Sequence, residues 1–207
     1  MSFMEYMRSG GDIMWIILVL SVAGLALVIE RTIFFIVSST DPRVLESEFA
    51  RALSKGDAAA LNSSVSGRSS MHRIFSAAYS SWSADGETMR LILEQQVRRE
   101  IYRWEKNLSL LGIIAKVSPL LGLLGTVLGM VQMFQSMNLG GAVNSAAVTG
   151  GIWKALFTTV AGLAVAIPVI IAHGILTGMI DSAEETMRRG ADFIMMEHSG
   201  RGSWNSR

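Results

Sequence analysis

The sequence lacks cysteine and carries little charge. Its 207 residues include no Cys, three Pro and 17% charged residues, and the formal net charge is +1. Without cysteine the chain can form neither a disulfide framework nor a thiolate metal site. The small net charge argues against a nucleic-acid binder, which would present a strongly basic face. Neither observation fixes the compartment, which must be inferred from what the sequence contains.

The motifs of soluble enzymes are also absent. The sequence has no Walker A loop, no zinc-type histidine pair and no cysteine nucleophile. His72, His173 and His198 are scattered. His173 falls inside an apolar stretch, where we interpret it as a packing histidine. We therefore expect no metal site, no cofactor and no bond-making enzyme activity.

Half of the residues are hydrophobic, and most of them gather in three long runs. The runs cover 13–37, 108–137 and 151–180, and a bilayer-spanning helix needs about 20 apolar residues. Glu30 and Arg31 interrupt the first run. We interpret them as a local pair at the membrane interface, where arginine can extend to water; a buried functional carboxylate is the alternative. The pattern predicts an all-α membrane protein with three transmembrane helices.

The positive charges predict the topology. Ten Lys and Arg lie in 38–107 and four in 181–207, against one in 1–12 and none in the link 138–150. Cytoplasmic flanks carry the excess of positive charge. We therefore expect the short amphipathic start at 1–12 and the link to face the periplasm, and the other two segments to face the cytoplasm.

Local signals predict helices within 38–107. Asp41 suits an N-cap, Pro42 the first helical position, and Gly56 the end of that helix. A second, short helix is expected from Asp57, residues 62–70 are expected to form a loop, and a third helix is expected over 71–82.

From residue 87 the helical pattern continues without a breaker into the second apolar run. It predicts one helix over 87–137, about 75 Å long and kinked at Pro119. The third apolar run also continues outward in helical pattern past residue 180. Two of the three spanning helices are therefore expected to extend into the cytoplasm.

Small residues repeat along the second and third runs. Gly122, Gly125 and Gly129 share one helix face, and Gly162 and Ala166 repeat the small-xxx-small spacing. Such residues let membrane helices pack closely. We reason that one three-helix subunit cannot use all of these faces, which predicts a ring of subunits around a mostly apolar pore.

Thr126, Thr158 and Thr159 are hydroxyl residues within these runs, and singly each would bond to its own backbone. Lys154 lies about 140° around the helix from Thr159 and on the face of Thr158. Two interpretations of Lys154 stay open. It reaches water at the outer interface, or with Thr158 it borders the outer mouth of a channel at a partner contact.

The apolar parts of these runs contain no Asp or Glu, and neither does 13–29. A proton relay across a membrane needs a titratable carboxylate or histidine. We therefore hypothesise that a partner helix supplies the carboxylate.

Two stretches resemble a known family. Residues 119–130 read P-L-L-G-L-L-G-T-V-L-G-M, and residues 152–168 read I-W-K-A-L-F-T-T-V-A-G-L-A-V-A-I-P. They resemble the second and third spans of the MotA/TolQ/ExbB proton-channel family. The three spans, the large inner segment and the short outer link also resemble the ExbB/TolQ branch rather than the four-span MotA branch.

The resemblance implies a ring, usually of five subunits, in the bacterial inner membrane. Two copies of a single-span ExbD/TolR-type partner, which supplies an Asp, would thread its central channel, and proton flow would do work on a TonB- or TolA-like protein. By this similarity Thr126 and Thr159 match pore-facing threonines. Lys154 departs from the family, which commonly has Glu there.

Three rival functions stay open: a non-conducting scaffold, a motor driven by Na⁺, and a transporter of small solutes. A transporter would usually show inverted repeats with broken helices.

Overall fold

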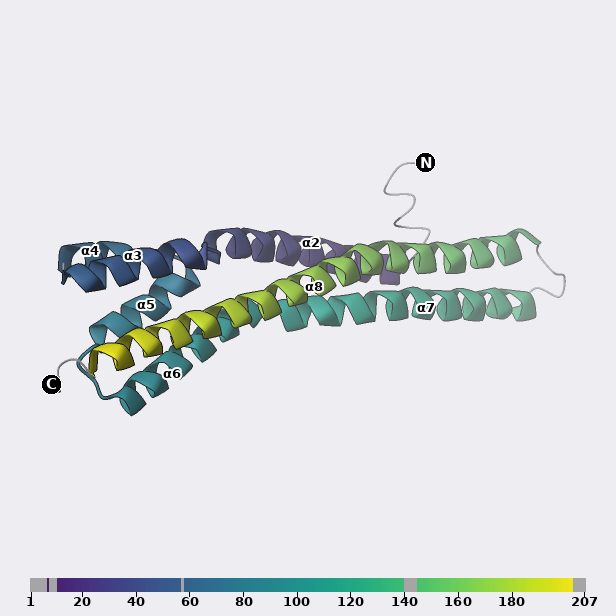
Figure 1. The fold of residues 1–207 in the computed structure, drawn as a ribbon. Helices are drawn as coiled ribbons and strands as arrows, with labels where there is room; N and C mark the ends of the chain where they lie inside the picture. The colour runs from purple at the N-terminus through teal and green to yellow at the C-terminus, as the bar shows by residue number, and fades with distance from the viewer. Residues whose placement is uncertain (1–6, 8–10, 57, 140–144, 203–207) are drawn as a thin grey trace. The chain divides into compact units, whose positions relative to one another are not determined.

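A computed structural model describes Met7 and residues 11–56, 58–139 and 145–202 (Figure 1). Most of the expected start at 1–12, the centre of the link at 138–150, Asp57 and the last five residues lie outside the described residues. The chain divides into two compact units. The first comprises Met1–Arg31 with Asn107–Leu176, and the second comprises Thr32–Lys106 with Thr177–Arg207.

Every regular element in the described ranges is an α-helix, which confirms the all-α prediction. The helices are α2 (Asp12–Ser38), α3 (Pro42–Lys55), α4 (Ala58–Val65), α5 (Ser70–Ser80), α6 (Gly86–Glu105), α7 (Leu108–Leu139) and α8 (Ser145–Gly202). Three helical stretches, which include α2, α7 and α8, are long and apolar enough to cross a membrane.

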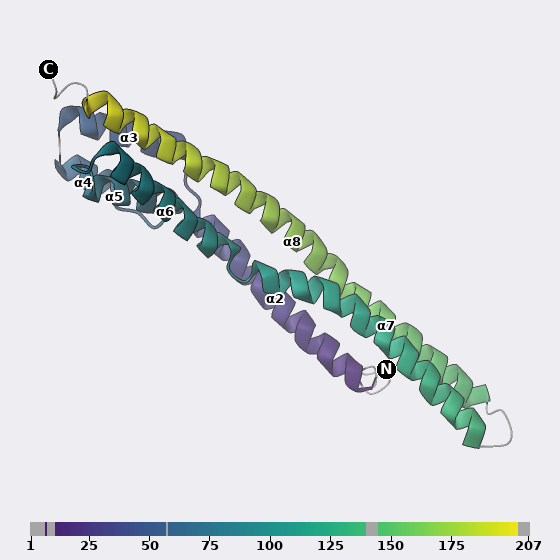
Figure 2. The same ribbon diagram turned by 90° about the horizontal axis from the view of Figure 1, so that it is seen from below.

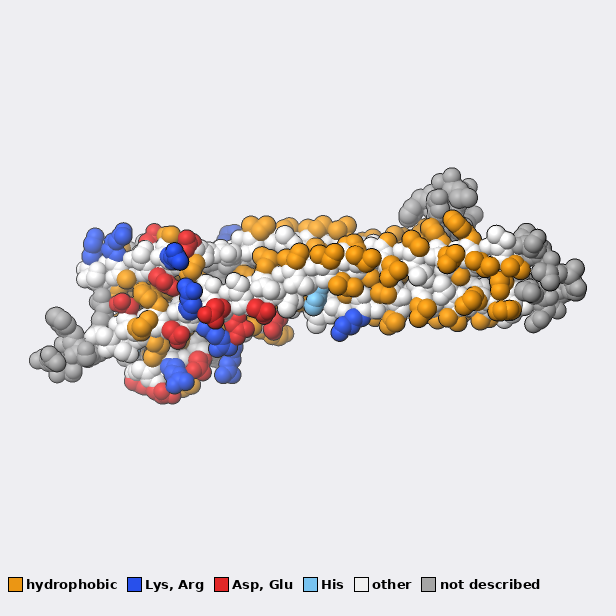
Figure 3. Space-filling view, turned by 45° about the vertical axis from the view of Figure 1, so that its right-hand side comes forward, with side chains coloured by type: hydrophobic (Ala, Val, Ile, Leu, Met, Phe, Trp, Pro, Cys, Tyr) orange, Lys and Arg blue, Asp and Glu red, His pale blue; other side chains and the backbone are white. Residues whose placement is uncertain are grey.

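The first unit combines most of α2 with α7 and the first part of α8. Gly24 of α2 lies between the other two helices, because a methyl group there would be 3.2 Å from Val169 Cγ2 and 3.5 Å from Ile114 Cγ2. On the outer faces, large apolar side chains such as Leu25 and Leu123 remain exposed. Figure 3 shows such side chains in orange along these helices, and acidic side chains gathered on the second unit. A bilayer would cover the exposed apolar side chains.

The start and end of α3 in the second unit follow the predicted signals. The Asp41 side chain accepts a hydrogen bond from the Arg43 N–H at 3.0 Å, and Pro42 occupies the first helical turn. Gly56 ends the helix with a φ of 64°, a left-handed conformation that favours glycine.

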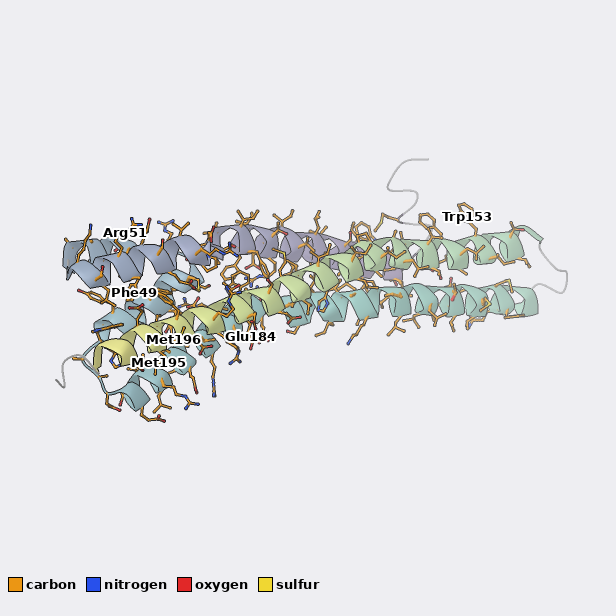
Figure 4. All side chains as sticks on the ribbon, viewed as in Figure 1. Phe49, Arg51, Trp153, Glu184, Met195 and Met196 are labelled. Atoms are coloured by element: carbon orange, nitrogen blue, oxygen red, sulfur yellow. The ribbon has the colours of Figure 1, made fainter. Side chains whose placement is uncertain are left out.

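Aromatic rings form the core of the second unit. Phe49 points from α3 into the unit (Figure 4) and meets Phe75 edge to face with ring centroids 5.0 Å apart. Trp82 lies 5.9 Å from Phe49 on the same measure. Gly190 of α8 faces α5, because a methyl group at Gly190 would be 3.5 Å from the Phe75 ring. The last part of α8 is thus held against α5 by close packing.

The prediction of one continuous helix over 87–137 was wrong at its centre. Helix α6 ends at Glu105, α7 begins at Leu108, and Asn107 between them has a φ of 63°. Asparagine tolerates this left-handed conformation because its short side chain bonds locally. Here Asn107 Nδ2 donates to Glu30 Oε2 at 3.1 Å, a partner 77 residues away along the chain. The spacing of apolar residues in the sequence gives no indication of this hydrogen bond.

One other boundary differs from prediction, and one extension agrees with it. Helix α4 extends to Val65, which is buried, so the helix covers the first half of the loop expected at 62–70. Helix α8 is uninterrupted for 58 residues, or about 87 Å, and it passes through Pro168. Its continuation beyond the expected span at 151–180 agrees with the helical pattern seen there.

Candidate functional site

The candidate site lies along the contact of α7 with the first part of α8, within the first unit. Figures 1 and 2 both show these two segments side by side. The backbones approach closely at Gly162. A methyl group there would be 2.6 Å from the Ser118 carbonyl oxygen and 3.0 Å from Gly122 Cα. Only glycine fits this position without moving a helix.

The same contact continues toward the end of α7 that precedes the link at 138–150. Gly125 faces the side chain of Thr158, and a methyl group on Gly129 would lie 3.1 Å from Ala155 Cβ. Ala166 is fully buried. The glycines of α7 therefore pack within one chain. In α8, a methyl group added at Gly174 or Gly178 would meet no described atom within 4 Å, so not every small-residue face is used within one chain and the ring stays a prediction.

The two adjacent threonines of α8 use their hydroxyl groups differently. Thr158 is fully buried and donates to the Ala155 carbonyl oxygen of its own helix at 2.9 Å. Thr159 donates across the helix contact to the Gly122 carbonyl oxygen at 3.1 Å. Thr159 thus connects α7 and α8 directly, whereas Thr158 fills the space opposite Gly125.

Thr126 is half-buried and donates to the Leu123 carbonyl oxygen of its own helix at 2.6 Å. Among the described residues no hydrogen bond joins its hydroxyl to that of Thr159. The two residues nevertheless meet at one carbonyl, because in an α-helix the oxygen of residue 122 accepts from the N–H of residue 126. Thr159 donates to that same Gly122 oxygen. The structure therefore brings both candidate threonines to one turn of α7.

Lys154 is half-buried and donates from Nζ to Gln132 Oε1 of α7 at 2.9 Å. A methyl group on Gly11 would lie 3.0 Å from the same nitrogen. The neighbouring Trp153 points away from α7 (Figure 4). The lysine thus has a polar partner within the chain that the sequence analysis missed; a glutamine on the opposite apolar run was the available signal. A role at an outer mouth stays a prediction.

The charged pair in α2 is confirmed, but its environment differs from expectation. Arg31 Nη2 contacts Glu30 Oε1 at 2.6 Å, and Arg31 is only 3% exposed. Protein atoms bury the guanidinium group, so it does not extend to water as predicted. Glu30 also accepts from Asn107. Its carboxylate is therefore already engaged within the first unit.

The chain was compared with known proteins. Residues 66–189 match the model of the MotA/TolQ/ExbB proton channel family, which covers the stretch from α5 into α8. The putative biopolymer transport protein ExbB-like 3 of Synechocystis sp. is 36% identical over 166 residues, 79% of each chain. The biopolymer transport protein ExbB of Helicobacter pylori is 41% identical over 83 residues, 40% of this chain and 57% of that protein. The Tol-Pal system protein TolQ of Haemophilus influenzae is 34% identical over 98 residues, 47% of this chain and 42% of that protein.

The residues matched by the family model, 66–189, contain the three threonines, the glycine contact and Lys154. Together with the three helices that can span a membrane, they support a multi-pass inner-membrane protein with a role in biopolymer transport. The chain belongs to the MotA/TolQ/ExbB proton channel family, in its ExbB/TolQ-like branch.

Proposed function

We propose that this chain is the channel-forming subunit of an inner-membrane motor driven by the proton-motive force. It acts with a single-span partner of the ExbD/TolR type and energises a TonB- or TolA-like protein. One observation carries the proposal: hydroxyl groups lie at the α7–α8 contact, but no Asp or Glu occurs between Glu105 and Asp181. Of the carboxylates and histidines that could relay a proton, this stretch contains His173, which we interpret as a packing residue, so the carboxylate would come from another chain.

Thr126 and Thr159 would receive that carboxylate. A threonine hydroxyl donates one hydrogen bond and accepts others, so it can stabilise both the ionised and the protonated acid without titrating itself. Both hydroxyls donate to backbone carbonyl oxygens. Each of those oxygens also accepts an N–H bond of its own helix, so it keeps a partner when the hydroxyl turns away. Each hydroxyl can therefore turn to a partner carboxylate at small cost. No covalent bond is made or broken in this step.

The driving force follows from the membrane potential. Each proton that crosses yields about 2.3 kcal/mol per 100 mV. The partner's carboxylate would be neutralised from one side of the membrane and ionised again toward the other. That cycle would bias rotation or rocking of the partner inside the channel. In the proposed topology the N-terminus faces the periplasm, and residues 38–107 and the C-terminus face the cytoplasm, because those segments carry most of the positive charge.

The channel would form at the centre of a ring of five copies. The support for this number is the family resemblance, since the glycine contacts are used within one chain. The mass of the purified chain in mild detergent tests it directly. A monomeric mass would contradict the ring.

The driving ion is tested in cells that express the chain with its single-span partner. The energised process is followed while an uncoupler collapses the proton gradient at constant Na⁺, and again after Na⁺ is removed. We expect the uncoupler to stop the process and Na⁺ removal to leave it unchanged. Work that continues after uncoupling would contradict the proposal. Dependence on Na⁺ would instead indicate a sodium-driven motor.

A further inference from the structure

The last turns of α6 carry cations that the proposed function does not use. They surround a hollow of about 680 Å³ on the surface of the second unit. The residues that line it are Gln95, Arg98, Arg99, Tyr102, Arg103 and Lys106. Four of the six are cationic, none is a carboxylate, and all are exposed. We call these six residues the α6 cationic face.

The spacing puts these side chains on one side of the helix. Residues three or four apart are neighbours on a helix surface. Arg98, Tyr102 and Lys106 therefore form one row, and Gln95, Arg99 and Arg103 form the adjacent row. From residue 95 to residue 106 the rows extend about 17 Å along the helix axis.

One of the carboxylates within this stretch of α6 is buried rather than exposed beside the cations. Glu100 is fully buried, with Oε2 contacting Arg73 Nη2 at 2.6 Å and Oε1 contacting Arg103 Nη1 at 3.0 Å. Two guanidinium groups thus share one carboxylate. Arg103 keeps about half of its side chain exposed, so this cluster adds net positive charge to the face rather than cancelling it.

The other cations of the face are weakly neutralised. Arg98 reaches Glu94 only at 3.9 Å, and Glu94 is already paired with Arg90 at 3.1 Å. Within the described part of the chain, neither Arg99 nor Lys106 forms an ion pair. The face therefore offers several cations to a ligand that brings its own negative charge.

Aromatic contacts fix the depth of this face relative to the membrane. The Trp104 ring lies 4.5 Å from Phe35 and 5.8 Å from Phe34, centroid to centroid, near the end of α2. On the same turns Ile36 is 72% exposed and Val37 is 55% exposed. These side chains end the apolar run of α2, which a bilayer would cover. The hydrocarbon edge therefore falls close to the end of α2, and Trp104 lies beside it.

The cationic residues consequently lie at headgroup level. Arg98 is six residues before Trp104, about 9 Å along the helix, and Lys106 is two residues after it. The headgroup layer is about 5–8 Å thick on each side of a bilayer, so Arg103 and Lys106 fall within it and the long Arg98 side chain reaches its outer edge. Tyr102, 73% exposed on this face, is a residue type enriched at membrane interfaces. Arginine presents a planar fork of donors that binds phosphate oxygens in pairs.

We propose that the α6 cationic face binds the phosphate groups of anionic glycerophospholipids. Bound lipid would hold the end of α6, just before the break at Asn107, at the membrane surface. The site recognises a phosphodiester with net negative charge, such as phosphatidylglycerol. Lipid binding at this site requires that the chain is inserted in a membrane but not that it conducts protons. A negative result in a proton-flux experiment would therefore not contradict the proposed lipid site.

The test uses the full chain in mild detergent, titrated with phosphatidylglycerol or phosphatidylcholine, with bound lipid counted by native mass spectrometry. The variant is Arg98→Gln, Arg99→Gln and Lys106→Gln together; Arg103 stays because it contacts Glu100. The matched control removes three exposed cations elsewhere: Arg51→Gln, Lys55→Gln and Arg68→Gln. Each cation near an anionic surface contributes about a fivefold factor. We expect the parent and the control to prefer phosphatidylglycerol, and the variant to bind it about a hundredfold more weakly at low salt.

Three results would overturn the proposal. Equal binding of the two lipids by the parent would exclude a site for anionic lipid. Equal weakening in the variant and the control would indicate general attraction to positive charge. A variant that binds phosphatidylglycerol normally but loses a co-purifying protein would assign the face to an acidic protein segment.

A second measurement does not depend on the triple variant folding. Because the chain has no cysteine, Tyr102→Cys provides a single site for a spin label, and Arg51→Cys, on α3 where Arg51 points outward (Figure 4), provides the control. In phosphatidylglycerol vesicles we expect the label at 102 to be shielded from a water-soluble relaxation agent several-fold more than the label at 51. Equal accessibility would place α6 away from the headgroups and overturn the proposal.

Discussion

The close approach of α7 and α8 at Gly162 gives a prediction whose size follows from the structure. In Gly162→Ala the new methyl group would lie 2.6 Å from the Ser118 carbonyl oxygen, where ordinary contacts are 3.4 Å or more. The shortfall is about 0.8 Å, the difference of those two distances. The carbonyl oxygen belongs to the backbone and the methyl carbon is bonded directly to Cα, so no side-chain rotation can relieve the overlap. The helices must separate, which also stretches the hydrogen bond from Thr159 to Gly122.

The cost can be isolated with a matched glycine. Overpacking in a tight contact costs about 1–3 kcal/mol, while replacing Gly by Ala within a helix gains about 1 kcal/mol. Gly174 lies in the same helix, and a methyl group added there would have no neighbouring atom within 4 Å, so Gly174→Ala should show the gain without the overlap. We expect Gly162→Ala to be less stable than Gly174→Ala by about 1–3 kcal/mol.

The measurement is the free energy of unfolding in mild detergent with increasing fractions of SDS, followed by tryptophan fluorescence. Proton-driven activity should fall with Gly162→Ala and persist with Gly174→Ala, because only the first change displaces Thr159. Equal stability of the two variants would refute the reasoning that the α7–α8 contact depends on backbone proximity at Gly162.

Four further predictions concern single side chains. Thr159→Val should preserve assembly, cost about 1 kcal/mol for the lost hydrogen bond, and abolish proton-driven activity. Arg73→Met should destabilise the second unit by about 3 kcal/mol, because it removes a partner from the fully buried Glu100; Glu100→Gln should cost less, since Arg73 is partly exposed and can be hydrated. Burial is the largest cause that lowers the pKa of His72 below its ordinary value of 6.5, against an opposing effect of Glu48. The unfolded chain then binds more protons than the folded chain as pH falls through 6.5. The contribution of His72 to the free energy of unfolding should therefore be complete above that pH and decrease below it. His72→Gln should remove this pH dependence. Asn107→Ala should cost about 1–2 kcal/mol for the left-handed conformation, and Asn107→Gly should not incur that strain.

Each of these predictions has a result that would contradict it. Normal activity of Thr159→Val would remove the threonine from the mechanism. A larger loss in Glu100→Gln than in Arg73→Met would mean that the carboxylate is not the costly group to leave unpaired. An acid sensitivity that persists in His72→Gln would assign it elsewhere. If Asn107→Gly destabilised as much as Asn107→Ala, the side-chain bond to Glu30 would outweigh backbone conformation.

The sequence was sufficient for the local features and for the family. Apolar runs, the caps of α3 and the helical continuation of α8 follow from residue type and short-range spacing, and the structure has them. The resemblance in residues 119–130 and 152–168 led to the family that the comparisons support.

The same reasoning could not predict contacts between residues that lie far apart in the sequence. Asn107 breaks the α6–α7 helix with a left-handed backbone while bonding to Glu30, and no local pattern links residues so far apart. Arg31 was expected to reach water because its helix was considered alone, and neighbouring protein buries it instead. Which small-residue faces meet within the chain was open for a similar reason: the glycines at 122, 125 and 129 pack against α8, whereas Gly174 and Gly178 meet no described atom within 4 Å.

Proton flux tests the central claim most directly. The chain alone, and the chain with its single-span partner, are reconstituted into vesicles that carry an internal pH indicator, and a membrane potential is imposed. We expect no flux above empty vesicles for the chain alone, flux for the complex, and loss of that flux when the partner's membrane carboxylate is changed to its amide. Flux through the chain alone would contradict it, because no Asp or Glu lies between Glu105 and Asp181 to relay the proton.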